Sequence, residues 1–148
     1  MATAINVQSM CSEAEWGARL KLAACYRIFD HLGWDEMIFN HITLKVPDED
    51  DAFLINPYGL HFSEVSASTL VKIDIDGNTL DGSEYPVNKA GSTQPSLSHP
   101  ELPDVHAILH THTPATMAPS SASCGLLPIT FSASAIPPRL PCHIFECP

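Results

Sequence analysis

Two histidines in the C-terminal half of the chain, His110 and His112, are the residues whose type and spacing most directly suggest chemistry. On a β-strand, side chains two positions apart lie on the same face, separated by a rise of about 6.6 Å. Two imidazole nitrogens in this arrangement can bind one divalent ion at about 2.0 to 2.1 Å each. The alternative is a pair of hydrogen-bonded structural histidines, because a His-x-His motif alone is weak evidence for a metal.

The segment that carries the pair is expected to be a short, partly buried strand. Residues 105–113 contain the apolar run Ala107 to Leu109 and follow a proline-broken loop over residues 82–104. His106 would share a face with His110 but would lie about 13 Å away, too far to join the pair easily. Pro114 suits the first turn of a helix that would carry residues 115–122 and that Pro119 would shorten or kink.

The clearest predicted helix covers residues 12–33. Ser12 and Glu15 fit an S-x-x-E capping box at its start, and Gly33 ends it. Apolar residues recur at every fourth position of this segment, and we expect the stripe that they form to pack on the core. The stripe consists of Trp16, Leu20, Ala24, Ile28 and Leu32.

Three further strands are expected between this helix and the histidine segment. Residues 38–45, 53–56 and 70–75 combine β-branched content with rough alternation, and turn residues follow each of them. Asp76-Gly77 is a strong turn signal after the last. One helix followed by a mostly antiparallel set of strands predicts an α/β protein with a helix-covered sheet, without the regular βαβ alternation of a Rossmann fold.

Composition restricts the range of functions. The 148 residues leave room for a single domain, 1–148, with one core and one site. The formal net charge is −10, and the sequence has no Lys/Arg cluster, so we expect neither nucleic acid nor a membrane as partner. Five cysteines without a regular framework favour a reduced, cytoplasmic protein, and no signal peptide or spanning segment is evident. A small molecule or another protein is the expected partner.

Several ordered blocks resemble the class II aldolase and adducin family, over roughly residues 13–129. The run from Pro103 to Thr113 is similar to the segment that delivers the first two metal histidines in that family. Residues 40–43, 53–60 and 64–72 resemble its early strands and the block that follows them. Residues 87–91 resemble the stretch before the site in its adducin-like branch.

The resemblance implies a three-layer α/β/α fold around a mostly antiparallel central sheet, here C-terminally shortened. It also implies a homo-oligomer, commonly a tetramer, and a divalent metal ion, with zinc expected first. By matching positions, His110 and His112 would be metal ligands, and Asn40 would lie where relatives contact a substrate phosphate or carboxylate. Gly59, Ser66 and Ser68 would lie in loops near that anion pocket, with ordinary turn or cap chemistry as the alternative.

The departures from the family pattern concern the rest of the site. The glutamate that acts as general acid/base in the sugar-phosphate aldolases aligns with Gly91, so the catalytic residue stays unknown. The third metal histidine of relatives comes from a distal segment that this sequence does not contain. His143, in the Pro-rich tail 130–148, is a possible substitute, although a solvated tail histidine is the alternative.

Two functional hypotheses therefore stand side by side. The first is a metal-dependent lyase that forms or cleaves a carbon–carbon bond in a small hydroxy-carbonyl or sugar-phosphate-like substrate. The second is a noncatalytic adducin-like domain that serves assembly or partner binding. A third interpretation is that the chain is a piece of a longer enzyme.

Overall fold

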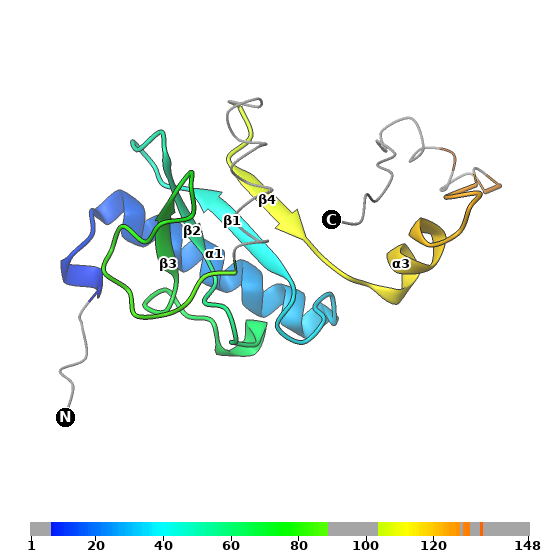
Figure 1. Cartoon of the computed structure of the whole chain (residues 1–148), viewed down its shortest axis with the longest axis horizontal. Coiled ribbons are helices and arrows are strands. Elements are labelled where there is room, and N and C mark those ends of the chain that lie inside the picture. Colours follow the sequence, from blue (N-terminus) through cyan, green and yellow to red (C-terminus); the bar gives the residue numbers. More distant parts are fainter. Residues whose placement is uncertain (1–6, 89–103, 128, 131–133, 135–148) are drawn as a thin grey trace. The chain divides into compact units, whose positions relative to one another are not determined.

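The computed structural model describes residues 7–88, 104–127, 129, 130 and 134 (Figure 1). Contacts within the chain divide it into two compact units, Met1–His112 and Thr113–Pro148, which are described separately. The prediction of a single domain over 1–148 stays a prediction. The first unit contains η1 (Val7–Ser9), α1 (Glu13–Leu32), β1 (His41–Lys45), β2 (Ala52–Ile55), η2 (Phe62–Glu64), β3 (Val71–Asp74) and β4 (Ala107–His110).

The predicted long helix is confirmed as α1, with both ends formed as expected. The Ser12 hydroxyl accepts a hydrogen bond from the Glu15 backbone N–H at 3.1 Å, which satisfies one of the free donors of the first turn. Gly33 follows the last turn with a φ of 65°, a left-handed conformation that costs glycine little. Its N–H bonds back to Asp30 O at 3.0 Å.

The face of α1 that packs on the core was predicted wrongly. Leu20, Ile28 and Leu32 of the apolar stripe are 52%, 55% and 47% exposed. A spacing of four residues advances about 400° per step, so a five-residue stripe winds about 160° around the helix and cannot stay on one face. The buried face also carries paired charges that apolar periodicity does not count. Its members are Glu15, Ala18, Arg19, Leu22 and Tyr26.

Four antiparallel strands form one sheet in the order β3-β2-β1-β4. Each predicted strand is confirmed at its core. β2 has the predicted length but begins one residue earlier, and the other three strands are shorter than the predicted segments. β4 comes from more than thirty residues farther along the chain than β3 and yet pairs with β1, with His41 opposite His110 and Ile42 opposite Leu109. The α/β class and the antiparallel sheet are therefore confirmed.

The two faces of the sheet have different environments. On one face, Ile42 and Leu54 join Leu22 and Tyr26 of α1 in the larger core cluster, and Figure 1 shows α1 running behind the strands. The other face carries a smaller cluster, which consists of Phe53, Ile55, Val71 and Ile73. Because side chains alternate along a strand, His41 and Thr43 point away from α1.

In the second unit, α3 (Pro114–Ser120) confirms the predicted short helix. Thr113 caps it by accepting from the Thr116 N–H at 3.2 Å, and Pro114 occupies the first turn, where no hydrogen bond is lost.

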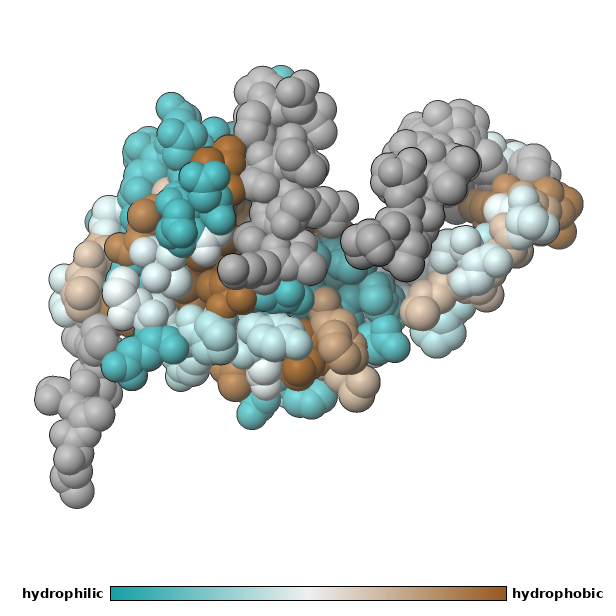
Figure 2. All heavy atoms as spheres, in the orientation of Figure 1, coloured by the Kyte–Doolittle hydropathy of each residue, from teal (hydrophilic) through white to brown (hydrophobic). Residues whose placement is uncertain are grey.

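Among the helices that the structure describes, none combines the length and apolar character needed to cross a membrane. Figure 2 shows hydrophilic residues over the β1–β2 turn, where the acidic run Asp48–Asp51 lies.

Candidate metal centre

His110 and His112 converge as the His-x-His spacing predicts. His110 ends β4, His112 follows two residues later, and their Nε2 atoms lie 2.9 Å apart. Two nitrogens bound to one tetrahedral ion at about 2.0 to 2.1 Å each would be about 3.3 Å apart. The observed separation is shorter and lies at hydrogen-bond distance, so the two rings have the geometry of the hydrogen-bonded pair and would have to open by about 0.4 Å to share an ion.

Glu36, from the loop between α1 and β1, fixes the orientation of the His112 ring. Its Oε2 lies 2.5 Å from Nδ1 of His112, on the opposite side of the ring from His110. A carboxylate on one nitrogen of a histidine holds the proton there and leaves the other nitrogen free as a ligand. Asn40 in turn accepts a hydrogen bond from the Glu36 backbone N–H at 2.5 Å.

His41 adds a third imidazole beside the pair. It lies opposite His110 on the neighbouring strand, with ring centroids 4.9 Å apart. Burial, followed by the proximity of His110 and His112, lowers the pKa of His41 to about 4. Burial and then His112 also lower the pKa of His110. Both shifts favour the neutral form of the imidazole, which is the form that binds metals.

Buried polar atoms without a hydrogen-bond partner gather at this place. Within the part of the chain that the structure describes, they come from β1, from the residue before it and from β4. Most buried polar groups in folded proteins are hydrogen-bonded, so such a concentration calls for an explanation such as a ligand. These atoms are Asn40 Nδ2, His41 Nδ1 and Nε2, Thr43 Oγ1 and His110 Nδ1.

The described residues provide two candidate ligands for a metal ion, His110 and His112. In residues 7–88 and 104–127, with 129, 130 and 134, no group of three or more His, Cys, Asp and Glu side chains is arranged to hold an ion. The His110–His112 pair fits a divalent ion by donor type and spacing, while a catalytic zinc typically has three protein ligands. His143, the predicted substitute for the third, lies outside the described residues, as does Gly91.

The predicted substrate-binding residues fall into two groups. Asn40 lies at the site, 2% exposed, with its Oδ1 engaged by Glu36 and its Nδ2 unpartnered in the described structure. Ser66 instead forms local hydrogen bonds with Thr69, and Ser68 is exposed in the same turn. Gly59 adopts a φ of 99° in the turn after β2. The roles of all four in substrate binding stay predictions.

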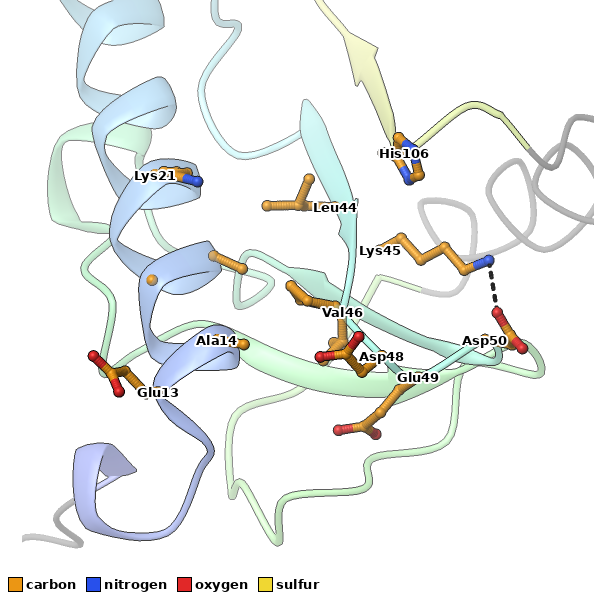
Figure 3. Close-up of a pocket in the computed structure, with 13 residues that line it drawn as sticks. Glu13, Ala14, Lys21, Leu44, Lys45, Val46, Asp48, Glu49, Asp50 and His106 are labelled. Atoms are coloured by element: carbon orange, nitrogen blue, oxygen red, sulfur yellow. Dashed lines mark ion pairs between the residues drawn. The ribbon is translucent and has the colours of Figure 1, made fainter.

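A groove elsewhere on the first unit does not contain the histidine pair. It has a volume of about 620 Å³ and lies between the start of α1 and the β1–β2 turn (Figure 3). His106 lines it, whereas neither His110 nor His112 does. Figure 3 shows Lys45 pointing away from α1 toward Asp50, with which it forms an ion pair at 3.4 Å. His106 is thus separated from the pair, as its spacing predicts.

Sequence reasoning missed two residues of this site, Glu36 and His41. His41 begins a strand that alternates visibly, but only the register of β1 against β4 brings it opposite His110. Glu36 is one of two adjacent acids in a short loop, 76 residues before His112. The acidic residue pair followed by Asn40 and His41 is the signal that could have directed attention to this loop.

The comparisons with known proteins show the family and the fold. The model of the family described as Class II Aldolase and Adducin N-terminal domain matches residues 20–146, so the chain belongs to this family. A solved aldolase II superfamily protein from Pseudomonas syringae is 42% identical, with a TM-score of 0.81 over 87% of this chain and 52% of its own. A solved L-fuculose 1-phosphate aldolase from Glaciozyma antarctica PI12 is 30% identical, with a TM-score of 0.69 over 82% of this chain and 48% of its own.

Relatives of known sequence include both branches of the family. A protein from Caulobacter vibrioides, whose name places it provisionally among the class 2 aldolases, is 43% identical over 96% of this chain and 55% of its own. Alpha-adducin from Rattus norvegicus is 48% identical over 76% of this chain and 16% of its own. The chain spans about half the length of the bacterial relatives. The predicted family and the class II aldolase fold are confirmed.

Proposed function

We propose that this chain is a metal-dependent lyase of the class II aldolase type. The observation that carries the proposal is the convergence of His110 Nε2 and His112 Nε2 to 2.9 Å, with Glu36 on the far side of the second ring. Family membership supports the same reaction class. The substrate class that we propose is a small hydroxy-carbonyl compound, including sugar phosphates such as the one named for the Glaciozyma antarctica aldolase.

In this proposal His110 and His112 hold a divalent ion, with zinc expected first because both ligands are imidazole nitrogens. Such an ion supplies Lewis-acid polarisation of a carbonyl oxygen, which stabilises developing negative charge by several kcal/mol. Asn40 contributes a buried amide whose Nδ2 donor has no partner in the described structure and can bind an anionic substrate group. No described residue is assigned as the general acid/base.

Turnover is the test of the lyase proposal. The purified chain, loaded with zinc, is incubated with L-fuculose 1-phosphate and a panel of other hydroxy-carbonyl phosphates, and carbonyl fragments are followed by mass spectrometry. We expect cleavage of at least one substrate, loss of cleavage in His110→Ala and retention in His106→Ala, because His106 lies in the groove away from the pair. Folded, zinc-loaded protein without turnover on the whole panel would contradict the proposal.

The second candidate function is a noncatalytic domain that serves assembly. Its support is the 48% identity to alpha-adducin, together with Gly91 at the position that aligns with the family's glutamate. The two candidates differ in the turnover experiment. A protein that binds zinc stoichiometrically but cleaves nothing would favour this second function.

We also propose that the chain acts as a homo-oligomer, as the resemblance implies. The loop that contains Glu36 carries three exposed apolar side chains, Trp34, Met37 and Phe39, which are 42%, 59% and 47% exposed. Adjacent exposed apolar residues favour association. Sedimentation at several protein concentrations tests this, and a monomer at the highest concentration would contradict it.

A further inference from the structure

We propose that Glu36 is a positioning residue that sets the metal affinity of the site by fixing the tautomer and orientation of His112. This inference rests on the proposed metal site and deepens it. Glu36 touches neither His110 nor the Nε2 side of His112, so it acts through the ring that it contacts.

The contact with Glu36 determines which ring nitrogen of His112 carries the proton. An ionised carboxylate can only accept hydrogen bonds, and a neutral imidazole carries one N–H. With Glu36 Oε2 at 2.5 Å, the proton of His112 must lie on Nδ1, because the other tautomer would set two acceptors against each other. The Nε2 lone pair is then directed at the point that His110 Nε2 also faces, 2.9 Å away.

Hydrogen bonds within the loop between α1 and β1 hold the backbone of Glu36. Asn40, almost fully buried, accepts from the Glu36 backbone N–H at 2.5 Å, and the Phe39 N–H returns to Glu36 O at 3.1 Å. The turn thus fixes the backbone of Glu36 at both of its polar groups. Asn40, the residue directly before β1, therefore holds the backbone of Glu36, whose carboxylate contacts His112.

The same turn contains a strained backbone conformation. Met37, next to Glu36, has a φ of 49°, a left-handed conformation that is uncommon outside glycine. Such a residue persists only where the surrounding contacts determine the conformation, and strain of this kind concentrates at functional sites. The strained turn is the one that delivers the Glu36 carboxylate to His112.

Asp35 provides a matched control for Glu36. It is the adjacent acid in the same loop, and it has the same charge. No described contact joins it to the histidines, whereas Glu36 bonds His112 directly. A general effect of negative charge near the site would appear in variants of both residues, whereas a positioning effect would appear only in variants of Glu36.

The experiment measures zinc affinity by competition with a chelator for wild type, Glu36→Gln and Asp35→Asn. Loss of an outer carboxylate partner typically lowers metal affinity about 10- to 100-fold, and we expect this loss for Glu36→Gln. Asp35→Asn should stay within about twofold of wild type, and Glu36→Asp should recover part of the loss. ¹⁵N shifts of the His112 ring in metal-free protein should show the Nδ1–H tautomer in wild type and a shift toward Nε2–H in Glu36→Gln.

The outcomes separate this proposal from the one on which it rests. Wild-type protein that binds no zinc would overturn the metal site and the role of Glu36 together. Zinc binding that is unchanged in Glu36→Gln, or lowered equally in Asp35→Asn, would overturn the role of Glu36 alone. The unfolding midpoint of Glu36→Gln checks that this variant is folded. It should stay close to that of wild type because the Glu36 side chain is 45% exposed.

Discussion

Two clusters of buried polar residues lie on the first unit, and they differ in how well their hydrogen bonds are satisfied. In the arginine cluster, defined as Glu15, Arg19, Lys72 and Asp81, the fully buried guanidinium bonds Glu15 at 2.8 Å and Asp81 at 2.9 Å. It also donates to the carbonyl oxygens of Ala67 and Leu70. In the histidine cluster, defined as Asn40, His41, Thr43, His110 and His112, five buried atoms lack partners in the described structure.

This difference separates a structural role from a functional one. The arginine cluster connects α1 to the turn before β3 and to the segment after it, so its cost of burial is offset within the fold. A buried polar atom without a partner costs about 1 to 3 kcal/mol. The histidine cluster carries several such costs on one edge of the sheet, where a water, an ion or a ligand would complete the bonding.

Removal of the guanidinium should have the largest effect on stability. Arg19→Met removes the donor of two backbone carbonyls and one donor each of Glu15 and Asp81, although Lys72 still donates to Glu15. Breaking a buried pair from one side costs about 3 to 5 kcal/mol. Urea denaturation measures this as a lower free energy of unfolding. Lys21→Met is the matched control, because Lys21 is exposed on the same helix, and it should change stability by about 0.5 kcal/mol or less. Equal effects of the two variants would contradict the structural role of the arginine cluster.

A pair of leucines on α1 tests which helix face packs beneath these clusters. Leu22 is 3% exposed and Leu20 is 52% exposed. Leu22→Ala should lower the free energy of unfolding by about 2 to 5 kcal/mol through lost burial and a cavity. Leu20→Ala should cost about 0.5 kcal/mol or less. If thermal or urea unfolding gave the reverse order, the apolar stripe would be the packed face after all.

Among the three substitutions of buried residues, the smallest effect on stability is expected for His41→Leu in the histidine cluster. His41 is 5% exposed, and neither ring nitrogen makes a hydrogen bond of good geometry in the described residues, although the Phe39 backbone partly opposes the lowering of its pKa. Exchange for an apolar side chain of similar volume removes two unsatisfied atoms, so metal-free protein should keep its stability within about 1 kcal/mol or gain some. Urea unfolding of metal-free protein checks this. A loss comparable to that of Arg19→Met would show that His41 holds the fold together.

The sequence allows much of the fold to be predicted because caps, turns and alternation are local signals. Ser12 and Gly33 mark the helix ends correctly, and the His110–His112 spacing is enough to place two rings together. Local signals do not predict which face of α1 is buried, because Arg19 is buried through partners that are distant in sequence. Glu36 meets His112 only through the return of β4 to β1, and no local pattern contains that pairing.

Metal content tests the central claim most directly. Elemental mass spectrometry is applied to wild type, His110→Ala, His112→Ala and the His106→Ala control, each loaded with zinc and then exchanged into metal-free buffer. The proposed site predicts about one ion per chain in wild type and in His106→Ala, and loss of the ion in both other variants. Wild-type protein that retains no metal, or equal retention in all four proteins, would contradict the claim that His110 and His112 form a metal centre.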